Sequence, residues 1–203
     1  SRNNRPSGRF WTGLITGETA TVEYHEPAAV RGKGRLHLYR VDHAYDEAVF
    51  GPEKNNFGFG ASLDCHLNAN CPEGDSLSNQ KQSVCRIIVV VEEGMGYCSG
   101  TLVNNTDEDG TPYLLSAFHC QDGFTPLWDL YRFDFNYRSA NCSDPGAEPN
   151  FDSVLGSELR AGRQANDFIL LEIIPDLPAA MDPYLSGWNR DAAVPDAGYS
   201  VHH

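Results

Sequence analysis

The fold is decided by the stretch CSGTLVNNTDEDGTPYLLSAFHC, residues 98–120. Residues 97–103 and 113–118 are typical of β-strands, and the polar connection between them holds Asp-Gly at 109–110, a strong turn signal. The stretch therefore predicts a β-hairpin with a cysteine near each end. His119 directly precedes the second cysteine, at the end of the second strand.

Further strands are predicted on both sides of this hairpin. Residues 84–92, VCRIIVVVE, form a continuous run rich in β-branched residues, typical of a strand buried on both faces. Residues 128–137 alternate, residues 167–174 are mostly apolar, and the polar residues 139–153 predict a loop. No long stretch shows the 3.6-residue period of an amphipathic helix, so we predict an all-β fold.

The first 60 residues differ from the rest of the chain. Two alternating segments, 19–24 and 34–41, predict a small β unit, and Gly-Phe-Gly at 58–60 predicts a linker. Residues 1–60 hold 8 Lys and Arg against 7 Asp and Glu, whereas residues 61–203 hold 7 against 21. This shift in charge indicates two units with a boundary near residue 60.

Composition narrows the class of protein. The chain has 203 residues, a net charge of −13 and no apolar run long enough to span a membrane. It begins at Ser1 without the features of a signal peptide, so we expect any such peptide to have been removed or left out. The acidic body argues against a nucleic-acid partner, because phosphate contacts need Lys and Arg. The six cysteines lack the paired spacing of a zinc ribbon and indicate disulfides in an oxidising compartment.

A histidine and an aspartate are candidates for catalysis. A serine protease needs a general base that deprotonates a hydroxyl, and an acid that orients this base. His119 is the candidate base, and Asp167, at the head of an apolar run, is the candidate acid. Taken alone, each also fits a structural interpretation, as a histidine packed at a strand end and as a strand-end turn residue.

No metal or cofactor site is predicted. His37 and His43 are six residues apart, neither they nor His25 have a cysteine nearby, and the acidic turn 107–110 lacks the rest of a calcium loop. The Asn-x-Ser/Thr patterns that begin at Asn104 and Asn141 are interpreted as polar turns rather than glycosylation sites.

Residues 61–203 resemble the trypsin-like serine proteases of the bacterial lysyl endopeptidase group. The matching segments follow one another in the order seen in that group. They are CHLNANCPEGD at 65–75, CSGTLVNNT at 98–106, LSAFHC at 115–120, NDFILLE at 166–172, and SGWNR at 186–190 with the final His202-His203.

This resemblance implies a chymotrypsin-like fold of two β-barrels. Residues 61–180 would form the first, six-stranded barrel, and residues 181–203 a linker toward a second barrel absent from this chain. Residues 1–60 resemble, more loosely, the end of a propeptide and would form a small β-rich segment before the barrel. The resemblance gives His119 the role of general base and Asp167 that of its orienting acid.

The resemblance also assigns cysteines. Cys98–Cys120 would be a disulfide beside the histidine, and Cys71–Cys142 a second one. The partner of Cys65 is expected beyond residue 203, and Cys85 is either a free core thiol or the partner of Cys65. The sequence departs from the motif of the group at Phe118, a change that leaves the His-Cys pair intact.

The nucleophile is missing from this pattern. No Gly-Asp-Ser-Gly or Gly-Ser-Ser-Gly motif is present, and Gly-Asp-Ser at 74–76 is followed by Leu77, so Ser76 is rejected. The serine is expected in a C-terminal protease segment. Alternatively, the chain is a fragment, or a module that kept the first barrel for binding or inhibition.

Together these observations predict a secreted bacterial serine endopeptidase that cleaves proteins or peptides after Lys, or after Lys and Arg. This chain would carry the catalytic His119 and Asp167 but not the serine. The alternatives are a non-catalytic binding or interaction protein, an inactive fragment built on the half-fold, and a disulfide-stabilised adhesion module in which His119 is structural.

Overall fold

The computed structural model describes residues 7–13, 15, 18–43, 66–143, 149–192 and 194–203. The chain divides into two compact units, Ser1–Tyr45 and Asp46–His203, and each is described by itself. The boundary predicted near residue 60 lies outside the described residues, as does Cys65. Within the described ranges, no helix is long and apolar enough to cross a membrane.

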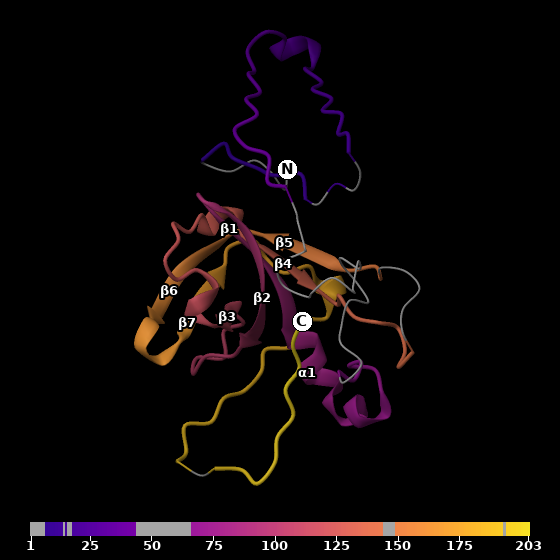
Figure 1. Cartoon of the computed structure of the whole chain (residues 1–203), viewed down its shortest axis with the longest axis vertical. Helices are drawn as coiled ribbons and strands as arrows, with labels where there is room; N and C mark the ends of the chain where they lie inside the picture. Colours follow the sequence, from indigo (N-terminus) through magenta and orange to yellow (C-terminus); the bar gives the residue numbers. More distant parts are fainter. Residues whose placement is uncertain (1–6, 14, 16–17, 44–65, 144–148, 193) are drawn as a thin grey trace. The chain divides into compact units, whose positions relative to one another are not determined.

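The second unit is built on one antiparallel sheet of seven strands that curls strongly (Figure 1). Its order is β5-β4-β1-β2-β3-β7-β6, and the prediction of an all-β, chymotrypsin-like half-fold is confirmed. The strands are β1 (Val84–Val91), β2 (Gly94–Val103), β3 (Tyr113–Ser116), β4 (Arg132–Phe135), β5 (Asp152–Leu155), β6 (Ser157–Arg163) and β7 (Phe168–Ile173). The helical elements of this unit are α1 (Ser78–Ser83) and 3-10 helices at Pro72–Leu77, Phe118–Cys120, Trp128–Leu130, Gln164–Asn166 and Ala179–Met181.

The two edge strands of the sheet, β5 and β6, are consecutive in the chain. Gly156 joins them with a φ of +98°, a conformation that favours glycine. Its N–H donates to the Tyr131 carbonyl beside β4, and its own carbonyl accepts the N–H of Ile174 beside β7. Gly156 therefore bridges the two edges of the sheet. The expected count of six strands differs from the observed seven because one bent strand is divided at this glycine.

The core lies inside the curled sheet. β1 is buried over almost its whole length, as its continuous apolar run predicts, and it pairs with β2 on one side and β4 on the other. Gly100 of β2 is closely packed, since a Cβ there would lie 2.8 Å from Ile87 Cδ1 and from Leu114 Cδ2, and both side chains would have to shift. The largest fully buried apolar side chains are Phe133, Phe135, Ile87, Leu102, Leu114, Leu171 and Ile173.

The structure corrects the prediction on both sides of β4. The predicted strand 128–137 is shorter, because the N–H groups of Leu130 and Tyr131 find carbonyl partners three residues back and form a 3-10 turn. Asn136, with a φ of +60°, follows the last residue of the strand. The predicted loop 139–153 gives way to β5 at Asp152.

The first unit contains no strand among its described residues, so the predicted β-rich segment is corrected there. Its one regular element in this part is a 3-10 turn, Ala28–Val30. Segments 19–24 and 34–41 alternate in sequence, but nearly all their residues are exposed. Because nearly all residues of both segments stay exposed among the described residues, burial does not stabilise a sheet there.

The cysteines follow the expected pairing. Disulfides join Cys71 to Cys142 and Cys98 to Cys120. Cys85 is a free thiol in β1 with no exposed surface, which agrees with the core-thiol alternative. Burial raises the pKa of this thiol well above its ordinary value, so Cys85 is held in its unreactive protonated form.

A buried charge cluster crosses β1, β4 and β5. Asp134 has no exposed surface and accepts hydrogen bonds from Arg86 (2.7 Å), Arg132 (2.6 Å) and Ser153 (2.6 Å). Burial opposes ionisation of Asp134, but these hydrogen bonds outweigh it, and its pKa is lowered. The Arg86 guanidinium also lies 3.5 Å from the centre of the Tyr137 ring.

Candidate active site

His119 and Asp167 are brought together by the pairing of β3 with β7. The last residue pair of these strands is Ser116 with Ile169. His119 follows β3 in the 3-10 turn Phe118–Cys120, and Asp167 directly precedes β7. Because the strands are antiparallel, the end of β3 and the start of β7 lie at the same end of the sheet.

The two side chains form a close hydrogen-bonded pair. His119 Nδ1 lies 2.7 Å from Asp167 Oδ2, and the backbone N–H of His119 donates to Oδ1 at 2.8 Å. A carboxylate acceptor at Nδ1 favours the tautomer with its proton on Nδ1, so that Nε2 can accept a proton. The side chains remain 70% and 52% exposed.

Asp167 adopts a left-handed backbone conformation, with a φ of +50°, at the end of the 3-10 turn Gln164–Asn166. Aspartate and asparagine enter this region more readily than most residues. The hydrogen bond from the His119 imidazole, and then that from the His119 backbone N–H, lowers the pKa of Asp167. The carboxylate therefore stays ionised beside the imidazole at neutral pH.

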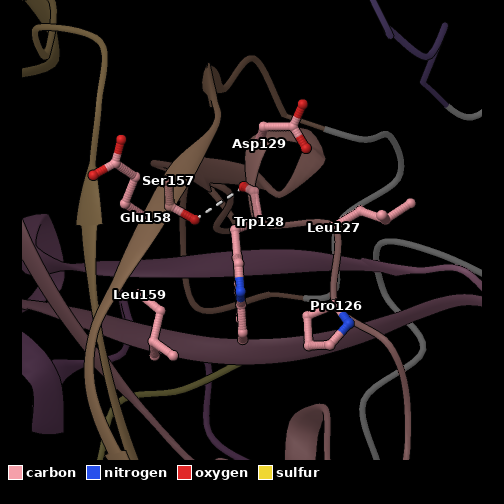
Figure 2. Close-up of a pocket in the computed structure, with 7 residues that line it drawn as sticks. All are labelled: Pro126, Leu127, Trp128, Asp129, Ser157, Glu158 and Leu159. Atoms are coloured by element: carbon pink, nitrogen blue, oxygen red, sulfur yellow. Dashed lines mark hydrogen bonds between the residues drawn. The ribbon is translucent and has the colours of Figure 1, made fainter. Parts of the chain in front are cut away.

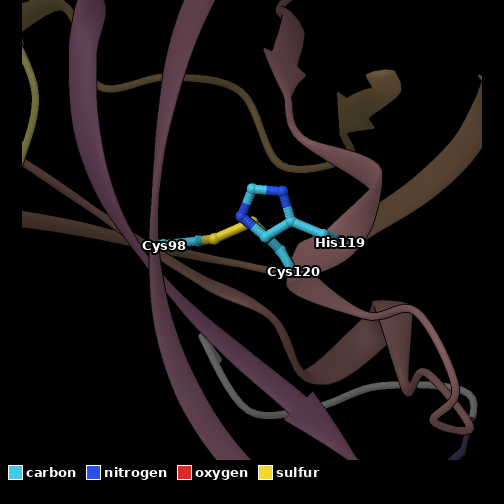
Figure 3. Close-up of side chains that lie close together, drawn as sticks. All are labelled: Cys98, His119 and Cys120. Atoms are coloured by element: carbon cyan, nitrogen blue, oxygen red, sulfur yellow. A yellow bond between two sulfur atoms is a disulfide. The ribbon is translucent and has the colours of Figure 1, made fainter. Parts of the chain in front are cut away.

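A disulfide supports the histidine-bearing turn. Cys120 in this turn is bonded to Cys98 in β2, and Figure 3 shows the His119 imidazole beside the sulfur atoms. One ligand atom from each of these three residues lies within 4.8 Å of the others. The sulfur atoms are bonded to each other and are not thiolates, the form that binds metals, so the cluster is a structural support rather than a metal centre.

A shallow groove with a volume of about 450 Å³ is lined by residues 126–129 and by Ser157, Glu158 and Leu159 of β6 (Figure 2). The Trp128 indole occupies its centre, and Ser157 Oγ donates to the Trp128 carbonyl at 3.1 Å. Neither His119 nor Asp167 lines this groove. The sequence does not predict this groove, because residues 126–129 and 157–159 are distant in the chain and are brought together only by the fold.

The carboxyl group of Asp167 is expected to titrate below its ordinary pKa of about 3.9. Replacing His119 with alanine should raise the midpoint toward that value, because the imidazole hydrogen bond is the main cause of the shift. The pair therefore stabilises the fold above the unfolded pKa, and this contribution is lost as pH falls through the folded pKa. NMR titration of the side-chain carboxyl carbon measures both midpoints; equal midpoints would show that the pair does not form in solution.

The curled antiparallel sheet is the first half of a chymotrypsin-like fold, with His119 and Asp167 at one end. Residues 59–203 match the model of a protein family described as lysyl endopeptidase, C-terminal domain. The chain belongs to this family. It is also 27% identical over 210 residues to a lysyl endopeptidase of Pseudomonas aeruginosa, a match that covers 98% of this chain and 44% of that protein. The chain thus spans less than half the length of this relative.

Proposed function

We propose that this chain is the histidine- and aspartate-bearing part of a secreted bacterial serine endopeptidase. The observation that carries the proposal is the 2.7 Å contact between His119 Nδ1 and Asp167 Oδ2. It is the contact by which an acid orients a general base for nucleophilic catalysis. Residues 61–180 are the barrel that holds this pair, residues 181–203 lead toward a second barrel, and residues 1–60 belong to a propeptide.

In the proposed reaction, a serine outside residues 1–203 attacks the carbonyl carbon of the scissile peptide bond. His119 Nε2 takes the proton of the serine hydroxyl and then gives it to the leaving amine, so that an acyl-enzyme forms. Water hydrolyses the acyl-enzyme with His119 again as base. Asp167 holds the imidazole in position and stabilises its cation in both steps.

The proposed substrates are peptides cleaved after Lys, or after Lys and Arg. Membership of the lysyl endopeptidase family supports this preference. The net charge of residues 61–203 agrees with a preference for basic substrates, since this part holds 21 acidic and 7 basic residues. An acidic surface attracts basic peptides. Secretion is supported by the two disulfides, because such bonds persist in oxidising compartments.

The test is to treat the natural full-length protein with a fluorophosphonate and to measure its intact mass before and after reduction. A label on a peptide outside residues 1–203, together with cleavage of lysyl but not neutral test peptides, is expected. A labelled polypeptide released only by reduction would show that a disulfide joins the two parts. A protein with neither label nor cleavage would contradict the proposal and favour a binding module.

A further inference from the structure

The exposure of the His119–Asp167 pair raises the question of what fixes its geometry. A single exposed pair contributes little to stability, because water and salt screen it and long side chains lose entropy when held, so several contacts together are needed to fix its geometry. The strand ladders end before the site: β3 pairs with β7 as far as Ser116 and Ile169, and β6 pairs with β7 as far as Arg163 and Phe168. The histidine-bearing and aspartate-bearing turns therefore extend beyond the paired strands, and other contacts must hold them together.

One such contact is a hydrogen bond between the turns themselves. Gln164 Nε2 donates to Asp122 Oδ2 at 2.8 Å. Gln164 is the first residue of the 3-10 turn that ends at Asp167, and Asp122 lies two residues after the turn that contains His119. This bond thus joins the segments that carry His119 and Asp167, although its two residues are 42 positions apart in the chain.

A second contact joins the same segments through apolar atoms. A Cβ placed on Gly162 of β6 would lie 3.4 Å from Cδ2 and 3.5 Å from Cε2 of Phe118. The Phe118 ring, directly before His119, therefore packs over the backbone of β6 two residues before Gln164. Phe118 is the position at which the sequence departs from the motif of the group, and here it has a packing role.

We propose that Asp122 and Gln164 are positioning residues, which hold the turn of His119 against the turn of Asp167. Phe118 and Gly162 form the apolar side of the same connection. The inference rests on the proposed function for its effect on catalysis, but the hydrogen bond is expected to order the His119 imidazole whether or not the protein is a protease.

The test exchanges donor and acceptor. Gln164→Glu places a second carboxylate opposite Asp122 and removes the donor. The double variant Gln164→Glu with Asp122→Asn restores the bond in reverse, because the amide now at position 122 donates to the carboxylate at position 164, and the net charge is unchanged. Gln164→Ala removes the bond without adding charge. The control is Gln82→Glu, because Gln82 likewise donates its side-chain amide to a carboxylate, that of Asp182, at 3.1 Å; Gln82 is half-buried and Asp182 is exposed. Circular dichroism confirms that each variant is folded.

Two readouts are used on the natural full-length protein. The ¹⁵N shifts of His119 report the ratio of imidazole protonated on Nδ1 to imidazole protonated on Nε2. This ratio is expected to fall at least about twofold in Gln164→Glu and in Gln164→Ala. In peptide hydrolysis, kcat is expected to fall about tenfold with KM unchanged, since small misplacements of catalytic groups are costly. The double variant should recover both, and Gln82→Glu should change neither.

Unchanged imidazole shifts in both Gln164 variants would overturn the inference, as would a double variant no better than Gln164→Glu alone. The failure of the proposed function gives a different result. In that case the wild-type protein hydrolyses no peptide, while the imidazole shifts still respond to the Gln164 variants and recover in the double variant.

Discussion

Replacing His119 with alanine in the natural full-length protein is expected to lower kcat/KM for a lysyl peptide by at least about 10⁴-fold. In the proposed reaction the His119 imidazole takes the proton of the serine and gives it to the leaving amine, and the variant lacks this group. Because the His119 side chain is 70% exposed, its loss should leave the fold intact. Steady-state hydrolysis, with circular dichroism of both proteins, measures the two effects.

The control is His66→Ala, which removes another exposed histidine of the family-matched region. This variant should hydrolyse the peptide at the wild-type rate. If His119→Ala kept wild-type activity, His119 would be structural and the adhesion or binding alternatives would be favoured. If both variants lost activity, the effect would not belong to the His119–Asp167 pair.

Replacing Asp134 with alanine is expected to destabilise the protein by about 3–5 kcal/mol. The change leaves the guanidinium groups of Arg86 and Arg132 largely buried without the carboxylate that both contact. Removing one partner of a buried pair costs more than the pair contributes, since the remaining charge has lost its solvation. Urea unfolding of the two proteins gives the difference in free energy.

Glu158→Ala is the matched control for Asp134, because Glu158 pairs with Arg160 at 3.0 Å on the surface. Its unfolding curve should nearly coincide with that of the wild type.

The pH dependence of stability provides a second check on Asp134. The lowered pKa of Asp134 stabilises the fold above the unfolded carboxyl pKa, and this stability is lost as pH falls through the folded value. Similar destabilisation by both variants would show that burial of the cluster is not the cause.

The sequence predicts those features whose causes are local. A continuous apolar run identifies β1, and the cysteine-bounded hairpin identifies β2 and β3. The resemblance correctly implies the disulfides Cys71–Cys142 and Cys98–Cys120. The structure places His119 next to Asp167, although their catalytic roles stay predictions.

The features that were missed depend on distant partners. β6 is almost entirely exposed, so it carries little apolar pattern, and its pairing with β7 is what makes it a strand. The converse holds in the first unit, where residues 19–24 alternate in sequence but stay exposed in the described structure and form no strand. Asp134 looks like any polar residue of an alternating strand until Arg86, 48 residues earlier, is placed beside it. The Asp122–Gln164 bond has no local signature either.

The bridge at Gly156 has a consequence for how this protein meets other molecules. A sheet with separate edges presents a row of backbone groups onto which the strand of another chain can add, and this is a common route to aggregation. Here the two edge strands run into each other at Gly156, and its N–H and carbonyl are both hydrogen-bonded, so at this bend the sheet offers no free backbone group to an added strand. Another molecule that approaches the sheet at this bend therefore meets side chains rather than free backbone groups.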